Sequence, residues 1–329
     1  LVGAAAACRR TPVIFNFGDS NSDTGGLQVG LGFIRGRPYG RLLPDGPIGR
    51  VSDGRLIIDF LCESVKASHL SPYLESLGAD FTNGANFAVS GSATLPKTVP
   101  FSLFIQVLQF LRFRSRSLDL ISQAKKGSED LINEEGFRNA LYTIDIGQND
   151  LYLAFFANSS YSQVVDKIPL ALAEIKGAVK ARPLGCLPQA HTIYWNGSSP
   201  VDEFGCLKSF NTAAKEFNKG LSSLCDELRS ELKDSSVVYT DMYAIKRGLI
   251  ANYSKHNFED PMKTCMACGC QACGDACQSC TCQTCSEGPL YISWDGVHYT
   301  EAANAILASE ILSTKYSMPR VKFSKFCRV

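Results

Sequence analysis

The chain of 329 residues lacks an excess of charge of either sign. Its 33 basic and 32 acidic residues leave a formal net charge of +1, and no basic run contains interleaved aromatic residues. Recognition of nucleic acid relies on such an excess or patch, so we expect no nucleic-acid partner. The sequence also lacks any apolar run of about 18 residues, so we expect no transmembrane segment.

The chain has no obvious internal boundary. It contains no internal repeat, no linker rich in Pro, Gly or Ser, and no block of like charge, while 45% of its residues are hydrophobic. We therefore expect one domain over residues 11–329. Residues 1–10 begin with the small apolar run Leu1 to Cys8, which resembles the end of a signal peptide, and we leave them out of the fold.

Cysteine is abundant and unevenly placed. Eight of the fourteen cysteines lie between Cys265 and Cys285. Three glycosylation sequons occur, at Asn158, Asn196 and Asn252. An even cysteine count together with sequons favours a secreted, extracellular protein with disulfides and N-linked glycans.

Short β-rich runs alternate with segments of helical periodicity. Strands are expected at residues 13–17, 87–89, 141–146 and 237–239, and helices at 53–65, 101–121, 164–179, 211–232 and 302–312. Asp53 and Thr300 are the expected caps of the first and last of these helices. This alternation predicts an α/β fold with a central, mostly parallel sheet between helices.

Two short motifs carry residues suited to nucleophilic catalysis. Gly18-Asp19-Ser20 follows the first predicted strand, at the sheet edge where ligands bind in open α/β folds. Asp295 precedes His298 by three residues, in a turn just before the last helix. A hydrolytic serine needs a base and an acid that orients it. Each motif alone is better explained as an ordinary turn.

A third motif makes the combination more specific. Asn149 follows the strand at residues 141–146, so its amide can face the same sheet edge as Ser20 and stabilise an oxyanion. The other histidines, at positions 69, 191 and 256, have no such context and are expected to be structural or solvated. No Gly-x-Ser-x-Gly motif occurs, which argues against an ordinary α/β-hydrolase.

The arrangement of these motifs resembles the plant GDSL esterase/lipases of the SGNH hydrolase superfamily. Four blocks carry the resemblance: FNFGDSNSDTGG at 15–26, NGANFAVSGS at 83–92, IGQND at 146–150 and SWDGVHYTEAAN at 293–304. The similar subgroup includes proteins labelled alpha-L-fucosidase and nodulin or latex esterase. Asn21 stands where the family name has Leu.

The resemblance implies a flavodoxin-like SGNH hydrolase fold and a serine esterase that needs no cofactor or metal. Ser20 is the implied nucleophile, and Asp295 and His298 complete the triad. The oxyanion hole is formed by the Ser20 backbone amide, Asn149 and a glycine of the second block, for which we favour Gly91 over Gly84. Expected substrates are acetyl or short-acyl esters of plant glycans, lipids or small molecules. The alternatives are a fucosidase-like glycosidase and an inactive binding or storage protein that kept the fold.

Two segments depart from the family pattern. The chain passes from a helix directly into Pro183, where the family has a central strand, so we expect that residues are missing there. The segment Cys265 to Cys285 has three interpretations: a metal-thiolate cluster, closely packed disulfides, or residue letters that differ from the natural ones. We favour the last, and within it Cys268 and Cys285 are the expected disulfide partners.

Overall fold

The computed structural model describes residues 12–44, 49–95, 100–124, 130–176, 200–268, 282–286, 290–323 and 325. The expected N-terminal tail and the stretch before Pro183 lie outside these ranges. The described strands are β1 (Ile14–Gly18), β2 (Gly84–Asn86), β3 (Leu141–Asp145), β4 (Tyr239–Thr240), β5 (Met266–Cys268), β6 (Cys282–Thr284) and β7 (Ser317–Met318). None of the described helices is long and apolar enough to span a membrane.

A three-stranded parallel sheet lies at the centre, in the order β2-β1-β3. The second strand begins earlier than its sequence suggests, because Gly84 already pairs with Ile14. Phe87 and Val89 still donate backbone hydrogen bonds to β1, at 2.7 and 3.2 Å. The carboxyl ends of all three strands therefore meet at one edge, which is the edge that Ser20 follows.

The two faces of β1 enter different cores, as the period of two in a strand dictates. Phe15 and Phe17 point into the larger core, where the Phe15 ring lies 5.4 Å from Phe137 and the Phe17 ring 5.2 Å from Phe87. Ile14 points the other way, into a smaller core. Both faces of the sheet are thus buried, which is typical of parallel α/β folds.

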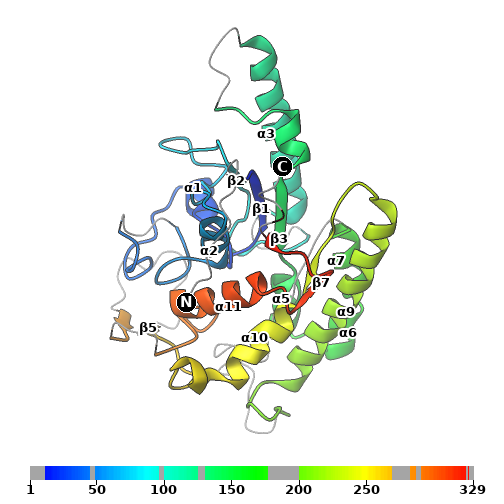
Figure 1. The fold of residues 1–329 in the computed structure, drawn as a ribbon. Helices are drawn as coiled ribbons and strands as arrows, with labels where there is room; N and C mark the ends of the chain where they lie inside the picture. The colour runs from blue at the N-terminus through cyan, green and yellow to red at the C-terminus, as the bar shows by residue number, and fades with distance from the viewer. Residues whose placement is uncertain are drawn as a thin grey trace.

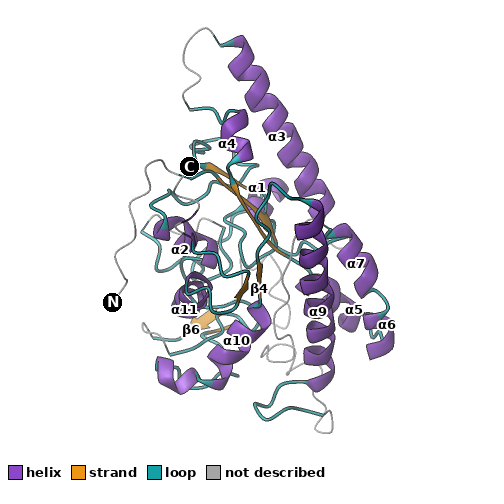
Figure 2. Cartoon of the chain, turned by 45° about the vertical axis from the view of Figure 1, so that its right-hand side comes forward, coloured by secondary structure: helices purple, strands orange, loops and turns teal. Residues whose placement is uncertain are grey.

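Helices flank the sheet on both sides (Figures 1 and 2). The helices with bounds are α1 (Gly26–Leu31), α2 (Ile57–Ser64), α3 (Leu103–Gln123), α4 (Glu134–Arg138), α5 (Gln148–Phe156), α6 (Tyr161–Val165), α7 (Ile168–Glu174), α9 (Lys208–Glu231), α10 (Met242–Ala251), η2 (Tyr253–His256) and α11 (Glu301–Leu312). The larger core packs against α3, α5 and α9, whereas α2, α10 and α11 share a separate core. The α/β class predicted from the alternating pattern is confirmed.

Two predicted elements differ from the structure. The helical pattern at residues 164–179 is divided into α6 and α7, with Pro169 in the first turn of α7, where a proline is tolerated. The expected strand at residues 237–239 is reduced to β4, which pairs with β7 in an antiparallel ribbon and not with the parallel sheet. Among the described residues no strand pairs with the outer edge of β3, and Tyr142 there is 43% exposed.

Candidate active site

The loop that carries Ser20 is fixed to the end of β1 by Gly18 and Gln106. Gly18 has a φ of +152°, and a Cβ atom there would lie 2.4 Å from the Asp145 carbonyl oxygen, so only glycine fits. The buried Gln106 side chain of α3 accepts from the Gly18 N–H at 2.9 Å and donates to its carbonyl at 2.8 Å. Ser20 itself is 7% exposed.

Four hydrogen bonds join the first three sequence blocks into one unit. The Gln148 amide donates to the Asp19 carboxylate. Asn149 Nδ2 donates to the Ser92 carbonyl at 2.8 Å, and the Ser90 N–H and hydroxyl each donate to Asp23 at 2.7 Å. Each bond is made by a residue next to, or within three positions of, a predicted site residue. The structure therefore holds the loops of Ser20, Gly91 and Asn149 against one another.

Asp23 links this unit to the start of α1. Its carboxylate accepts from the backbone N–H groups of Gly25 at 2.8 Å, Gly26, and Leu27 at 3.2 Å, while it also holds Ser90. A carboxylate at a helix N-terminus is favoured by the helix dipole. A single buried side chain thus fixes the loop after Ser20 to the second block.

The two candidate oxyanion glycines lie at different ends of β2. Gly84 begins the strand, and a Cβ there would lie 1.8 Å from the Ile14 carbonyl oxygen, which explains the glycine by packing alone. Gly91 lies beyond the strand with a φ of +78°, next to the Ser92 carbonyl that holds Asn149. A primary amide has two N–H donors, so one hydrogen of Asn149 Nδ2 remains for an oxyanion.

Asp295 and His298 form a hydrogen-bonded pair. His298 Nδ1 lies 2.7 Å from Asp295 Oδ2, and Oδ1 accepts from the backbone N–H groups of Val297 at 3.0 Å and His298 at 2.8 Å. Burial alone would raise the pKa of Asp295, but the charge and ring of His298 together with these backbone donors outweigh burial and lower the pKa to about 2. Asp295 is therefore ionised at neutral pH and orients the imidazole through Nδ1.

The turn that carries this pair is held by the fully buried Trp294. Its backbone N–H donates to the His298 carbonyl at 2.8 Å, and its backbone carbonyl accepts from the Met266 N–H of β5 at 2.7 Å. The Arg41 guanidinium lies over the indole ring, 5.1 Å from its centroid, and donates to the Cys285 carbonyl at 2.9 Å.

The expected pairing of Cys268 with Cys285 is wrong. Cys285 forms its disulfide with Cys265, and it also donates its backbone N–H to the Cys265 carbonyl at 2.7 Å. The β5–β6 hairpin register pairs the backbone of Cys268 with that of Cys282. Neither Cys265 nor Cys285 is available as a metal ligand. The described residues contain no His, Cys, Asp and Glu group arranged to hold a metal, and residues 269–281 of the cysteine-rich segment lie outside them.

The helix after His298 is capped as predicted, but Asp53 has another role than expected. Thr300 Oγ1 accepts from the Ala303 N–H at 3.3 Å and begins α11. Asp53 does not cap α2; at the start of that helix the N-cap residue Leu56 donates its backbone N–H to Asp59 at 2.8 Å. It accepts instead from the Glu301 N–H at 2.7 Å, in the first turn of α11. Nearness in sequence suggested the wrong helix, because α2 and α11 pack side by side.

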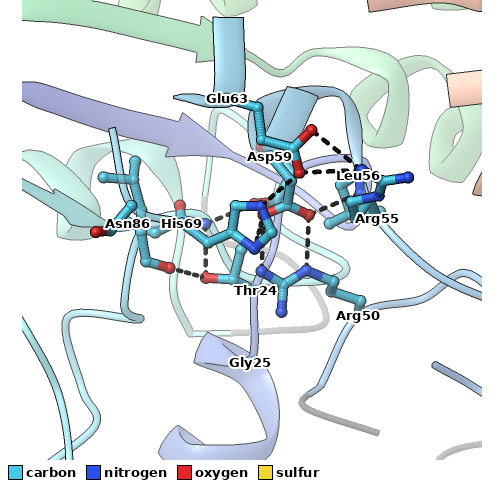
Figure 3. A network of polar contacts seen from close by, with 12 residues as sticks. Thr24, Gly25, Arg50, Arg55, Leu56, Asp59, Glu63, His69 and Asn86 are labelled. Atoms are coloured by element: carbon cyan, nitrogen blue, oxygen red, sulfur yellow. Dashed lines mark hydrogen bonds and ion pairs between the residues drawn. The ribbon is translucent and has the colours of Figure 1, made fainter. Parts of the chain in front are cut away.

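A polar network around Arg50 lies between α2 and the loop after Ser20 (Figure 3). Arg50 and Asp59 form a bidentate pair at 2.8 and 2.7 Å with both side chains almost fully buried. Burial would raise the pKa of Asp59, but the Arg50 guanidinium outweighs it and holds the pKa below its ordinary value. His69 bonds Glu63 at 2.9 Å on the exposed side of this network, in agreement with its expected structural role.

The structure leaves one predicted contact open. No hydrogen bond joins Ser20 Oγ to the His298 ring in the described part of the chain. Catalytic hydrogen bonds are often long in the absence of substrate.

Sequence reasoning missed Gln106, Gln148, Asp23 and Arg41. Asp23 and Gln148 lie within the recognised sequence blocks. No sequence signal marked Gln106 on α3 or Arg41 in its loop.

The predicted glycosylation sites differ in their surroundings. Asn158 is exposed after α5, with a left-handed φ of 56°. The Asn252 side-chain amide donates to the Gly248 carbonyl at 2.9 Å, so the nitrogen that a glycan would occupy is engaged at the end of α10. Asn196 lies outside the described residues.

Comparisons with known proteins agree with the motifs. The family model described as GDSL-like Lipase/Acylhydrolase matches residues 14–311. The chain is 50% identical to GDSL esterase/lipase LIP-4 of Arabidopsis thaliana, with 98% of this chain and 91% of the relative covered. It is 49% identical to GDSL esterase/lipase At1g09390 of the same plant, at 99% and 93% coverage. A relative named Alpha-L-fucosidase 3, also from Arabidopsis thaliana, is 36% identical at 91% and 90% coverage.

The alignment with LIP-4 spans 347 positions, more than the 329 residues of this chain, so that relative carries residues that the chain lacks.

Proposed function

Because the chain belongs to the GDSL-like lipase/acylhydrolase family, we propose that Ser20 is the nucleophile with which it hydrolyses carboxylic esters. The observation that carries this proposal is the set of bonds that holds the Ser20, Gly91 and Asn149 loops together at one sheet edge. The ionised Asp295 bonded to His298 Nδ1 supplies an oriented base.

In the proposed reaction, His298 Nε2 takes the Ser20 proton as Oγ attacks the ester carbonyl. The tetrahedral intermediate loses the alcohol, which receives that proton, and leaves an acyl group on Ser20. Water then attacks the acyl group with the same base, and the carboxylic acid and free Ser20 are released. Asp295 remains ionised throughout and stabilises the imidazolium.

The oxyanion is proposed to accept hydrogen bonds from the backbone N–H groups of Ser20 and Gly91 and from Asn149 Nδ2. Asn149 is already fixed by its bond to Ser92, so it needs no reorganisation during the reaction, which is the condition for strong electrostatic stabilisation. The positive φ of Gly91 turns the backbone beyond β2 and supports the choice of this residue.

We propose acetyl or short-acyl esters of plant glycans, lipids or small molecules as substrates, and a secretory destination, apoplastic or vacuolar. The Cys265–Cys285 disulfide supports an oxidising compartment. Exposure of Asn158 makes it the favoured site of N-linked glycosylation, whereas the engaged amide of Asn252 disfavours that position.

A glycosidase is the second candidate because one relative is named a fucosidase. That chemistry generally needs an acid and a nucleophile or base from two carboxylates. Asp19 accepts bonds from Asn21 and Gln148, and Asp150 accepts from the Thr94 N–H and hydroxyl, so both carboxylates already serve structural roles. The esterase is therefore the better supported candidate.

The test is hydrolysis of p-nitrophenyl acetate by the full chain, by Ser20→Ala and by the matched control Ser22→Ala in the same loop. We expect Ser20→Ala to lose activity by at least about 10³-fold and Ser22→Ala to keep it. Equal rates for wild type and Ser20→Ala would overturn the proposal. Hydrolysis of p-nitrophenyl fucoside that persists in Ser20→Ala would favour the glycosidase. Failure of both substrates with a folded wild type would favour the inactive binding protein.

A further inference from the structure

A cavity of about 350 Å³ lies beside the C-terminal half of α3 and shares no residue with the candidate active site. Tyr73, Phe81, Phe113 and Leu120 form its apolar wall, and Arg112, Arg116 and Asp130 are its charged residues. Its size falls in the range of small-molecule sites. An apolar wall with charges of mainly one sign is suited to an amphipathic anion.

The cavity and the candidate active site lie at opposite ends of α3. Gln106 holds Gly18 at the catalytic edge, whereas Ser117 donates to the Ile132 carbonyl at 2.7 Å, close to where the chain enters α4 and β3. These two residues are separated by about 16 Å along the helix, at 1.5 Å per residue. Figure 1 shows α3 extending from the sheet toward the top of the molecule. A ligand in the cavity would therefore not occupy the oxyanion site.

The wall of the cavity is already formed. The Phe113 ring makes edge contacts with Phe81, at 5.7 Å between centroids, and with Tyr73, at 6.1 Å. The Ser117 bond fixes α3 to the opposite wall. A ligand that enters such a preformed site loses less affinity to ordering of the protein.

Within the described part of the chain, the two exposed arginines that line the cavity have no ion-pair partner. Arg112 and Arg116 are one helical turn apart, and neither forms an ion pair or hydrogen bond with a described residue. Arg114, between them on another face of α3, pairs with Glu134 at 2.6 Å. Like charges at i and i+4 repel each other, and among the described residues that line the cavity Asp130 is the one acidic side chain. An anion placed between the two guanidinium groups would remove this repulsion.

We propose that this cavity binds the anion of a medium-chain carboxylic acid. The hydrocarbon chain lies against Tyr73, Phe81 and Phe113, and the carboxylate is held by Arg112 and Arg116, whose planar guanidinium groups suit it. The proposal does not depend on the role of Ser20. The site recognises both parts of the ligand, so an uncharged alcohol of equal length binds more weakly.

The experiment is isothermal titration of octanoate into the full chain carrying Ser20→Ala, with octan-1-ol as the uncharged probe. We expect saturable octanoate binding that is at least about tenfold weaker in the double variant Arg112→Gln/Arg116→Gln. Leu120→Trp, which fills the cavity and leaves both charges in place, should weaken binding to a similar extent. Arg114→Gln is the matched control on the same helix and should bind within about twofold of the parent.

Absence of saturable octanoate binding to the folded parent would overturn the proposal. Binding that is unchanged both in the double arginine variant and in Leu120→Trp would also overturn it, because octanoate would then occupy another site. Equal affinity for octanoate and octan-1-ol would contradict the role of the guanidinium groups. Rates on p-nitrophenyl acetate, measured in the same variants with Ser20 intact, should stay unchanged, so failure here is distinguishable from failure of the esterase proposal.

Discussion

Asp295 illustrates how a single side chain sets the chemistry of this site. Its pKa of about 2 results from His298 and two backbone N–H groups that together outweigh its burial. The carboxylate is thus ionised at neutral pH and lies 2.7 Å from Nδ1 of His298, so that Nε2 is the ring nitrogen directed away from it. In the proposed reaction, Asp295 positions the base and does not exchange protons with substrate.

Replacement of Asp295 by Asn should therefore lower kcat without unfolding the protein. The amide can offer an N–H to Nδ1 and stabilise the wrong imidazole tautomer, so we expect kcat on p-nitrophenyl acetate to fall by about 10³- to 10⁴-fold with little change in KM. Asp241→Asn is the matched control, because Asn also caps helices and Asp241 only caps α10. A kcat for Asp295→Asn within tenfold of wild type would contradict the assigned role.

At the scale of elements, the ends of three parallel strands bring the site together. Gly147 begins α5 with a φ of +105°, and a Cβ there would lie 2.4 Å from the Phe217 ring of α9. The helix can start directly after β3 only because this residue has no side chain. Because α5 starts at this point, the Gln148 side chain can donate to the Asp19 carboxylate and the Asn149 side chain to the Ser92 carbonyl.

We expect Gly147→Ala to reduce both stability and turnover. The strained φ and the contact with Phe217 should lower the free energy of unfolding by about 2 to 3 kcal/mol, measured by urea denaturation. The resulting displacement of Asn149 should lower kcat by about tenfold or more. Gly78→Ala is the control, since Gly78 has a φ of +70° but open space around it and no contact with the site. If both variants had equal turnover, the position of α5 would not matter for catalysis.

The sequence predicted these elements better than it predicted their contacts. Alternating and helical periodicity located β1, β3, α3, α9 and α11 to within a few residues. A regular buried face accounts for this in α9, whereas in α3 the apolar residues Val107, Leu108 and Leu111 are exposed. Sequence patterns failed to predict the pairing of β4 and the helix that Asp53 caps, since both depend on which distant segment packs alongside. Gln106 and Arg41 were invisible for the same reason: a buried polar side chain is defined by the backbone group it meets, which lies far away in the chain.

At the scale of the whole molecule, the Arg50–Asp59 pair joins α2 to the loop that precedes it, in the buried network beside the loop after Ser20. Both side chains are almost fully buried, and each neutralises the other. Breaking such a pair leaves a buried charge without compensation, which costs more than the pair itself contributes. Exposed pairs such as Arg114–Glu134 contribute little by comparison.

Asp59→Asn should accordingly destabilise the protein by about 3 to 5 kcal/mol at pH 7, against less than about 1 kcal/mol for the control Glu134→Gln, both measured by urea denaturation. The pKa of Asp59 is lowered in the folded state, so its contribution is complete above the unfolded value of about 3.9 and is lost as the pH falls below it. The stability of wild type should thus decline more steeply than that of Asp59→Asn below about pH 4. Parallel pH profiles would contradict the pairing.

The most direct test of the central claim is covalent labelling of the full chain with a fluorophosphonate, followed by mass spectrometry of its peptides. We expect one adduct, on Ser20, that forms equally in Ser22→Ala and is absent from Ser20→Ala. No adduct on folded wild-type protein, or an adduct that persists in Ser20→Ala, would contradict the assignment of Ser20 as the nucleophile.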